Sequence, residues 1–100
     1  MQFIVLGKIT DKYAGKPIAD MQDVLKGEWA ASREWYKKGW LRETWLRADN
    51  IGSIGIFEVE SRAKMDEIIV NYPGIKEGLV TAEIQEIVPY AGFFFDMIDK

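Results

Sequence analysis

The residues with the clearest chemical potential lie in the stretch from Pro17 to Gly39, PIADMQDVLKGEWAASREWYKKG, where polar side chains interrupt an apolar helical face. At about 100° of rotation per residue, the apolar side chains of this stretch gather on one side of a helix. These side chains are Ile18, Met21, Val24, Leu25, Trp29, Trp35 and Tyr36. Glu28 and Ser32 lie in the middle of that arc, one or two turns from Met21 and Trp35. A carboxylate therefore points to where a leucine would be expected.

Two interpretations of Glu28 are open. It is either a buried acid paired with an arginine or with backbone donors, because an unpaired buried carboxylate costs several kcal/mol, or a general base whose pKa is raised by its apolar surroundings. Gly27 favours the second interpretation slightly. A glycine inside a helix costs about 1 kcal/mol relative to alanine, so its place beside Glu28 predicts that another segment packs close to the backbone there.

Further candidate site residues follow the helix in the segment Trp40 to Ala48, WLRETWLRA. Side chains alternate along a strand, so Arg42 and Arg47 face opposite ways and Arg47 shares a face with Trp45. A surface arginine is usually solvated or ion-paired, and tryptophans such as Trp35 and Trp45 are more often core than ligand cage. Four tryptophans within residues 29–45 nevertheless favour an aromatic-walled pocket between the helix and this strand.

Composition excludes several kinds of chemistry. The chain has 100 residues, which is one domain, and it contains neither cysteine nor histidine. Disulfides, thiolate catalysis, Ser-His-Asp chemistry and most transition-metal sites are thereby excluded. A net charge of −3 without a basic cluster argues against nucleic acid as a partner. No apolar run is long enough for a signal peptide or a membrane span, so we expect a cytoplasmic protein.

The elements that must position these residues follow from local patterns. Strands are expected over Gln2 to Thr10, Trp40 to Ala48, Ser53 to Glu60 and Leu79 to Val88, and helices over Pro17 to Gly39 and Arg62 to Asn71. Asp11 to Lys16 is expected to be a loop, Ser61 an N-cap, and Tyr72-Pro73-Gly74 a helix stop. Residues from about 89 to 100 form a C-terminal tail.

The predicted order of elements, βαββαβ, is the ferredoxin-like α+β arrangement, a four-stranded antiparallel sheet with two helices on one face. The first strand is apolar on both faces at Phe3, Ile4, Val5 and Leu6, so the second sheet face should also be buried. A second copy of the chain is the simplest cover. We therefore predict a homodimer whose sheets face each other as a dimeric α/β barrel, with the Phe93-Phe94-Phe95 tail reaching over the partner.

The segment Leu25 to Ile69 resembles muconolactone isomerase and its relatives within the dimeric α/β-barrel superfamily. The matching features are an acid in the long helix eleven residues before a glycine, a Trp/Arg-rich second strand, the strand end IFEVES, and a helix with a Met-acid-acid core. The sequence departs from the family where Glu43, not a histidine, follows Arg42, and where the C-terminal tail is aromatic instead of His-Pro-Ser. These departures concern the substrate more than the fold.

The resemblance implies a cofactor-free, metal-free isomerase that shifts a proton within a small unsaturated lactone or enone. By position, Glu28 falls where the family has its candidate base, and Arg42 falls on an arginine that would hold a substrate carboxylate. Ser32, Trp35, Trp45 and Arg47 would complete the substrate site. Two alternatives stay open, namely a cofactor-independent monooxygenase or cyclase acting on polyketide-like substrates, and a non-catalytic barrel that binds a small ligand.

Overall fold

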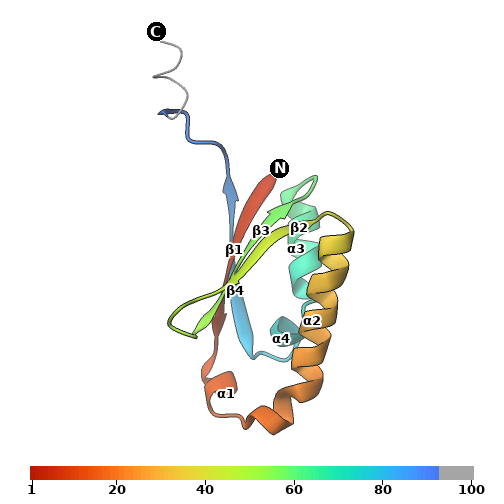
Figure 1. Cartoon of the computed structure of the whole chain (residues 1–100), viewed down its shortest axis with the longest axis vertical. Coiled ribbons are helices and arrows are strands. Elements are labelled where there is room, and N and C mark those ends of the chain that lie inside the picture. Colours follow the sequence, from red (N-terminus) through yellow and green to blue (C-terminus); the bar gives the residue numbers. More distant parts are fainter. Residues whose placement is uncertain (93–100) are drawn as a thin grey trace.

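The computed structural model describes residues 1–92 of the chain (Figure 1). Its four strands form one antiparallel sheet in the order β2-β3-β1-β4. The elements, in chain order, are β1 (Gln2–Ile9), α1 (Asp11–Ala14), η1 (Ile18–Met21), α2 (Gln22–Lys37), β2 (Leu41–Leu46), β3 (Gly52–Glu58), α3 (Arg62–Val70), α4 (Pro73–Lys76) and β4 (Val80–Ile87). Helices α2, α3 and α4 lie on one side of the sheet (Figure 1). The predicted ferredoxin-like α+β fold is confirmed.

The long helix has the predicted limits but begins as a tighter coil. Pro17 precedes a 3₁₀ turn, η1, and α2 continues from Gln22. At the other end Gly39 has a φ of +80°, and the Trp40 amide donates to the Trp35 carbonyl at 3.0 Å. A left-handed residue followed by this 6→1 hydrogen bond is the Schellman motif, which glycine permits without steric cost.

The second half of the chain also follows local signals. The Ser61 hydroxyl accepts a hydrogen bond from the Lys64 amide at 3.0 Å, so Ser61 is the predicted N-cap of α3. Helix α3 ends before the Tyr72-Pro73-Gly74 stop, as predicted, but the chain then forms the four-residue helix α4. The loop predicted after β1 was also wrong, since residues 11–14 form α1 with Thr10 as its N-cap.

The core lies between the sheet and the helices. Phe3 and Val5 of β1, Phe57 of β3 and Met65 of α3 are buried there. The opposite face of β1 carries Ile4 and Leu6, so the predicted two-sided apolar strand is confirmed.

The sheet face that the helices do not cover is apolar in one part and polar in another. Ile4 and Leu6 pair with Ile56 and Ile54 of β3, and all four are only half-buried. On β4, three residues of this face are polar and exposed, namely Thr81, Glu83 and Gln85. The predicted Phe93-Phe94-Phe95 cover lies outside the described residues, and within the described part of the chain no helix is long and apolar enough to cross a membrane.

Candidate active site

Helix α2 is fixed to α4 through a close contact at Gly27. A Cβ atom at Gly27 would lie 3.2 Å from Cγ of Pro73, which is tighter than an ordinary van der Waals contact. The predicted close approach of another segment beside Glu28 is therefore confirmed. The contact brings Gly74, the next residue of α4, against the carboxylate of Glu28.

Glu28 is a buried carboxylate that has no ion-pair partner among the described residues. Its residue exposure is 8%, and its Oε2 atom has no hydrogen-bond partner within residues 1–92. Burial raises the pKa of Glu28 above its ordinary value of 4.5, and the nearby Gly74 amide opposes this only in part. Desolvation disfavours the charged form of an acid, so this carboxyl takes up a proton more readily than one in water.

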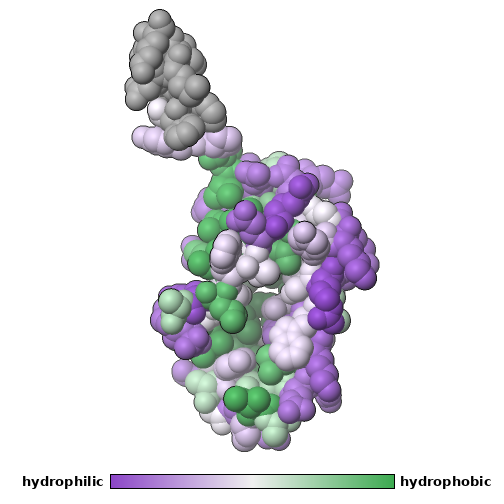
Figure 2. Space-filling view, in the orientation of Figure 1, coloured by the Kyte–Doolittle hydropathy of each residue, from purple (hydrophilic) through white to green (hydrophobic). Residues whose placement is uncertain are grey.

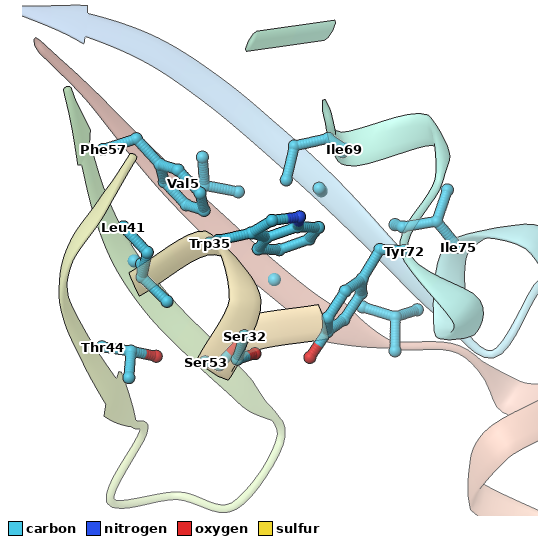
Figure 3. Close-up of a pocket in the computed structure, with 14 residues that line it drawn as sticks. Val5, Ser32, Trp35, Leu41, Thr44, Ser53, Phe57, Ile69, Tyr72 and Ile75 are labelled. Carbon is cyan, nitrogen blue, oxygen red and sulfur yellow. The ribbon is translucent and has the colours of Figure 1, made fainter. Parts of the chain in front are cut away.

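Tyr72 lies beside Glu28 at the start of α4. Burial, together with the negative charge of Glu28, raises the pKa of Tyr72 to about 12, while a hydrogen-bonding interaction with the Ser32 hydroxyl lowers it slightly. The Tyr72 and Ser32 oxygens point toward one another (Figure 3). The Tyr72 phenol is therefore a neutral hydrogen-bond donor at every physiological pH.

Ser32, Tyr72 and the sheet enclose a cavity, here called the inner cavity, with an empty volume of about 470 Å³ including its mouth. Its apolar wall includes Val5, Trp35, Leu41, Phe57, Ile69 and Ile75. The Trp35 ring meets Phe57 edge-on at 5.8 Å and Tyr72 at 5.4 Å between ring centroids. Four hydroxyl groups lie along one side of this cavity in Figure 3, those of Ser32, Thr44, Ser53 and Tyr72. The cavity is thus apolar with one polar side.

A wider depression, here called the outer hollow, opens from the inner cavity toward solvent. The two share the four hydroxyl residues, and the outer hollow adds Glu28, Trp29, Arg33, Trp45 and Leu46. It is visible in Figure 2 as the hollowed surface between the β2–β3 hairpin and α2. Glu28 therefore lies at the mouth of the inner cavity, between the apolar interior and water.

The structure brings together four of the six residues that the sequence nominated. Glu28 and Ser32 of α2 line the site from the helix side, and Trp35 forms part of the wall of the inner cavity. Trp45 borders the outer hollow and is 60% exposed. The expected aromatic-walled pocket between the long helix and the second strand is therefore present.

The two nominated arginines lie elsewhere. Arg42 occupies an irregularity in the β2–β3 register, and its Nε donates to the Gly39 carbonyl at 2.9 Å. Arg47 forms an ion pair with Asp49 at 2.7 Å in the turn after β2. Neither side chain lines the inner cavity or the outer hollow. Their partners are a helix end and a turn, so the structure gives both arginines a local role.

Four residues of the site were not nominated from the sequence. Tyr72 and Gly74 were interpreted only as a helix stop, and Thr44 and Ser53 as ordinary strand positions. A signal was present for Ser53, which shares a strand face with Phe57, so that a hydroxyl interrupts an apolar pattern there. Thr44 shares the face of Leu41 only because of the irregularity at Arg42, which alternation along the sequence does not reveal. Nothing local marks Tyr72, whose place beside Glu28 results from a contact between distant segments.

Within the described part of the chain, no group of three or more His, Cys, Asp or Glu side chains is arranged to hold a metal ion. The charged and polar groups of the site include the Glu28 carboxylate, the four hydroxyls shared with the inner cavity and, in the outer hollow, Tyr13, Arg33 and Asn50. This set can accept and return a proton and can donate hydrogen bonds to a carbonyl oxygen.

Comparison with protein-family models identifies the family of this chain. The family model described as muconolactone delta-isomerase matches residues 1–90. The chain belongs to this family. It is accordingly an enzyme of an isomerase family, although a search of curated proteins finds no match.

Solved structures share the fold of this muconolactone delta-isomerase family member. A muconolactone isomerase has a TM-score of 0.77 at 16% identity, covering 91% of this chain and 92% of that one. A 5-chloro-2-hydroxyhydroquinone dehydrochlorinase from Burkholderia phenoliruptrix, in complex with 2,5-dihydroxybenzoquinone, has a TM-score of 0.70 at 18% identity, covering 88% and 94%. An antibiotic biosynthesis monooxygenase has a TM-score of 0.54 at 16% identity, covering 89% and 100%. At these identities the likeness concerns the fold.

Proposed function

We propose that the protein is a cofactor-free isomerase that moves a proton within a small unsaturated lactone or enone, with Glu28 as the base. The observation that carries the proposal is the position of Glu28, a buried carboxylate whose Oε2 has no hydrogen-bond partner within residues 1–92 and which lies at the mouth of the inner cavity. Family membership supports the reaction class. The dehydrochlorinase neighbour, which holds a small oxygenated ring, shows that this fold accepts such ligands.

The proposed reaction is a shift of one proton without net change in composition. The Glu28 carboxylate removes a proton from a carbon next to the conjugated system, and the C–H electron pair passes into the carbonyl as an enolate. The protonated Glu28 then returns the proton to a different carbon, and the electrons return to form the shifted double bond. A carboxyl whose pKa is raised toward neutrality is suited to both steps.

Tyr72 is proposed as the group that stabilises the enolate oxygen. Its phenol stays protonated, lies beside Glu28 and faces Ser32, so it can donate to a developing negative charge. We assign no substrate contact to Arg42 or Arg47, because their guanidinium groups hold the Gly39 carbonyl and the Asp49 carboxylate.

The decisive experiment is proton exchange measured by NMR in D₂O with butenolides and cyclic enones. Glu28→Gln is expected to lower exchange and isomerisation by about 10²–10⁴-fold, the usual contribution of a positioned acid–base group. Glu34→Gln, which neutralises an exposed carboxylate on the same helix, is the matched control and should retain the activity. Equal activities of the two variants would exclude Glu28 as the base.

A second candidate function is cofactor-independent oxygenation or cyclisation of an aromatic polyketide-like substrate. The apolar wall around Trp35 and Phe57 favours it, and the monooxygenase neighbour shares the fold. Oxygen consumption with anthrone-like substrates, followed with an oxygen electrode, would establish this activity, and its absence across a panel would remove it. The non-catalytic alternative is not retained, since the family is one of enzymes.

We also propose that the protein forms the homodimer predicted from the sequence. The half-buried Ile4, Leu6, Ile54 and Ile56 support this proposal, because together they form an apolar centre on the sheet face that the helices leave open. Light scattering coupled to size-exclusion chromatography should give the mass of two chains for the wild type. Ile56→Lys should give the mass of one chain, and a wild-type monomer would contradict the proposal.

A further inference from the structure

The charged groups around the site are unevenly distributed. Within residues 1–92, Glu28 is the only carboxylate that lines the outer hollow, and its charge is close enough to Tyr72 to raise the pKa of that phenol. Arg42 and Arg47 are held at Gly39 and Asp49. Arg33 borders the outer hollow but is exposed, and it does not line the inner cavity. Among the described residues, no cation lines the inner cavity.

The polar groups that do line the inner cavity are neutral hydroxyls from three different elements and the start of α4. Thr44 and Ser53 make no side-chain hydrogen bond within residues 1–92, so both hydroxyls are available to a ligand. Ser53 owes its position partly to Gly7, where a Cβ atom would lie only 2.9 Å from the Ser53 Oγ. Hydroxyls can both donate and accept, and they therefore suit the hydroxyl and carbonyl oxygens of a ligand.

A carboxylate in this cavity would be opposed on two counts. It would lose its hydration in an apolar space without gaining a cationic partner, and it would lie close to the charge of Glu28. An uncharged oxygen substituent has a lower desolvation cost and finds hydrogen-bonding partners at Ser53 and Thr44.

We propose that the inner cavity selects an uncharged ring bearing hydroxyl or carbonyl oxygens, and that it rejects the same ring bearing a carboxylate. This inference rests on the proposed function, because it names the substrate class for the same site. It also changes the expectation drawn from the sequence, in which an arginine would anchor a substrate carboxylate.

The test measures binding without turnover. Two saturated γ-lactones serve as probes, one with a carboxymethyl and one with a carbamoylmethyl substituent, which match in size and differ in charge. Their Kd values are measured at pH 7.5 by calorimetry and by quenching of tryptophan fluorescence, to which Trp35 in the cavity wall contributes. The amide is expected to bind at least tenfold more tightly than the acid. Equal or tighter binding of the acid, or no binding of either probe, would overturn the proposal.

Matched variants identify the groups responsible. Glu28→Gln should reduce the preference for the amide to less than threefold, whereas Glu34→Gln should leave it unchanged. A tight acid complex that is lost in Arg33→Gln would show that the rim arginine anchors a carboxylate and would overturn the proposal.

A second pair tests the hydroxyls independently of Glu28. Ser53→Ala should weaken binding of the amide about five- to tenfold, whereas Thr81→Val, which removes a hydroxyl on the opposite sheet face, should leave it unchanged. Unchanged binding in Ser53→Ala would refute the proposed role of the cavity hydroxyls in binding the ligand.

Failure of this inference is distinguishable from failure of the proposed function. A preference for the neutral probe without proton exchange on any unsaturated lactone would refute the isomerase proposal and leave the selectivity intact. Proton exchange combined with a preference for the acid would retain Glu28 as a base and refute the selectivity.

Discussion

The pocket between α2 and the sheet and the turn between β2 and β3 each hold a carboxylate whose pKa is displaced, in opposite directions. In the pocket, burial raises the pKa of Glu28, and Oε2 has no partner within the described residues. In the turn, the Ile51 amide donates to Asp49 and lowers its pKa, with a further contribution from Arg47.

The pocket and the turn differ in how a charged side chain is accommodated. In the turn the charge is paired at the surface, and in the pocket it is buried without a partner among residues 1–92. The ion pairs of the described residues, including Arg62–Asp66 and Lys64–Glu67, lie at the surface, where such pairs contribute about 0–1 kcal/mol each. Glu28 is the one buried charged residue in the described part of the chain, and it has no cationic partner. The carboxylate that is least favourable for stability is the one placed at the cavity.

After Glu28→Gln, the largest expected effect concerns Tyr72, the neighbour of the buried carboxylate. Tyr72→Phe should lower kcat on the order of 10²-fold with little change in KM, because one donor to the enolate oxygen is removed. Ultraviolet titration of tyrosinate should show that one tyrosine, absent in the variant, ionises near pH 12. Ionisation of Tyr72 itself near pH 10 would contradict the contrast between the buried pocket and the exposed turn.

The next-largest effect is expected for Gly74→Ala, which should lower the stability of the fold. The added Cβ would collide with the Glu28 carboxylate and lie 3.0 Å from a Val80 methyl group, and overpacking of this kind costs about 1–3 kcal/mol. Urea unfolding measures the loss. Gly15→Ala is the matched control, since its Cβ would meet only the Asp11 carbonyl at 3.4 Å. If Glu28 is the obstacle, combining Gly74→Ala with Glu28→Ala should restore part of the lost stability, and strict additivity would show that it is not.

The pH dependence of stability should reveal the raised pKa of Glu28. A raised pKa means that the folded protein binds more protons than the unfolded chain above pH 4.5, so stability falls as pH rises through that range. The slope for one group is at most about 1.4 kcal/mol per pH unit. Urea unfolding between pH 4 and 8 should show this decline in the wild type and its absence in Glu28→Gln. Parallel stability curves for the two proteins would instead indicate that Glu28 is a structural acid whose charge is satisfied in the folded protein.

The smallest expected effect is at Asp49, and its sign is opposite. A lowered pKa contributes stability that is present above pH 3.8 and is lost as pH falls through the folded-state value. Asp49→Asn should therefore make the acid limb of the stability curve less steep and leave neutral pH almost unaffected. A steeper acid limb in Asp49→Asn would contradict a lowered pKa for Asp49.

Local sequence signals determined most of the fold and part of the site. Gly39, Ser61 and Gly27 each act through near neighbours or through a simple steric requirement, and all three predictions are confirmed. The four-residue helices α1 and α4 escaped notice because one turn is too short to show a period.

The remainder of the site depends on register and on distant contacts. The irregularity at Arg42 changes which side chains of β2 face the helices, and alternation alone does not reveal it. Tyr72 and Gly74 contact Glu28 although more than forty positions of the chain separate them from it. A family resemblance could nominate Glu28 as a candidate base, but not the neighbours that surround it in the fold.

The contact between Gly74 and the Glu28 carboxylate has a consequence for the history of the family. A side chain at position 74 is incompatible with the observed position of the acid, so the two sites are not free to vary independently. Descendants and ancestors of this chain that keep the acid should keep glycine at position 74, and lineages that lose the acid should accept larger residues there. Paired substitution at positions 28 and 74 would thus record where the buried acid was gained or lost.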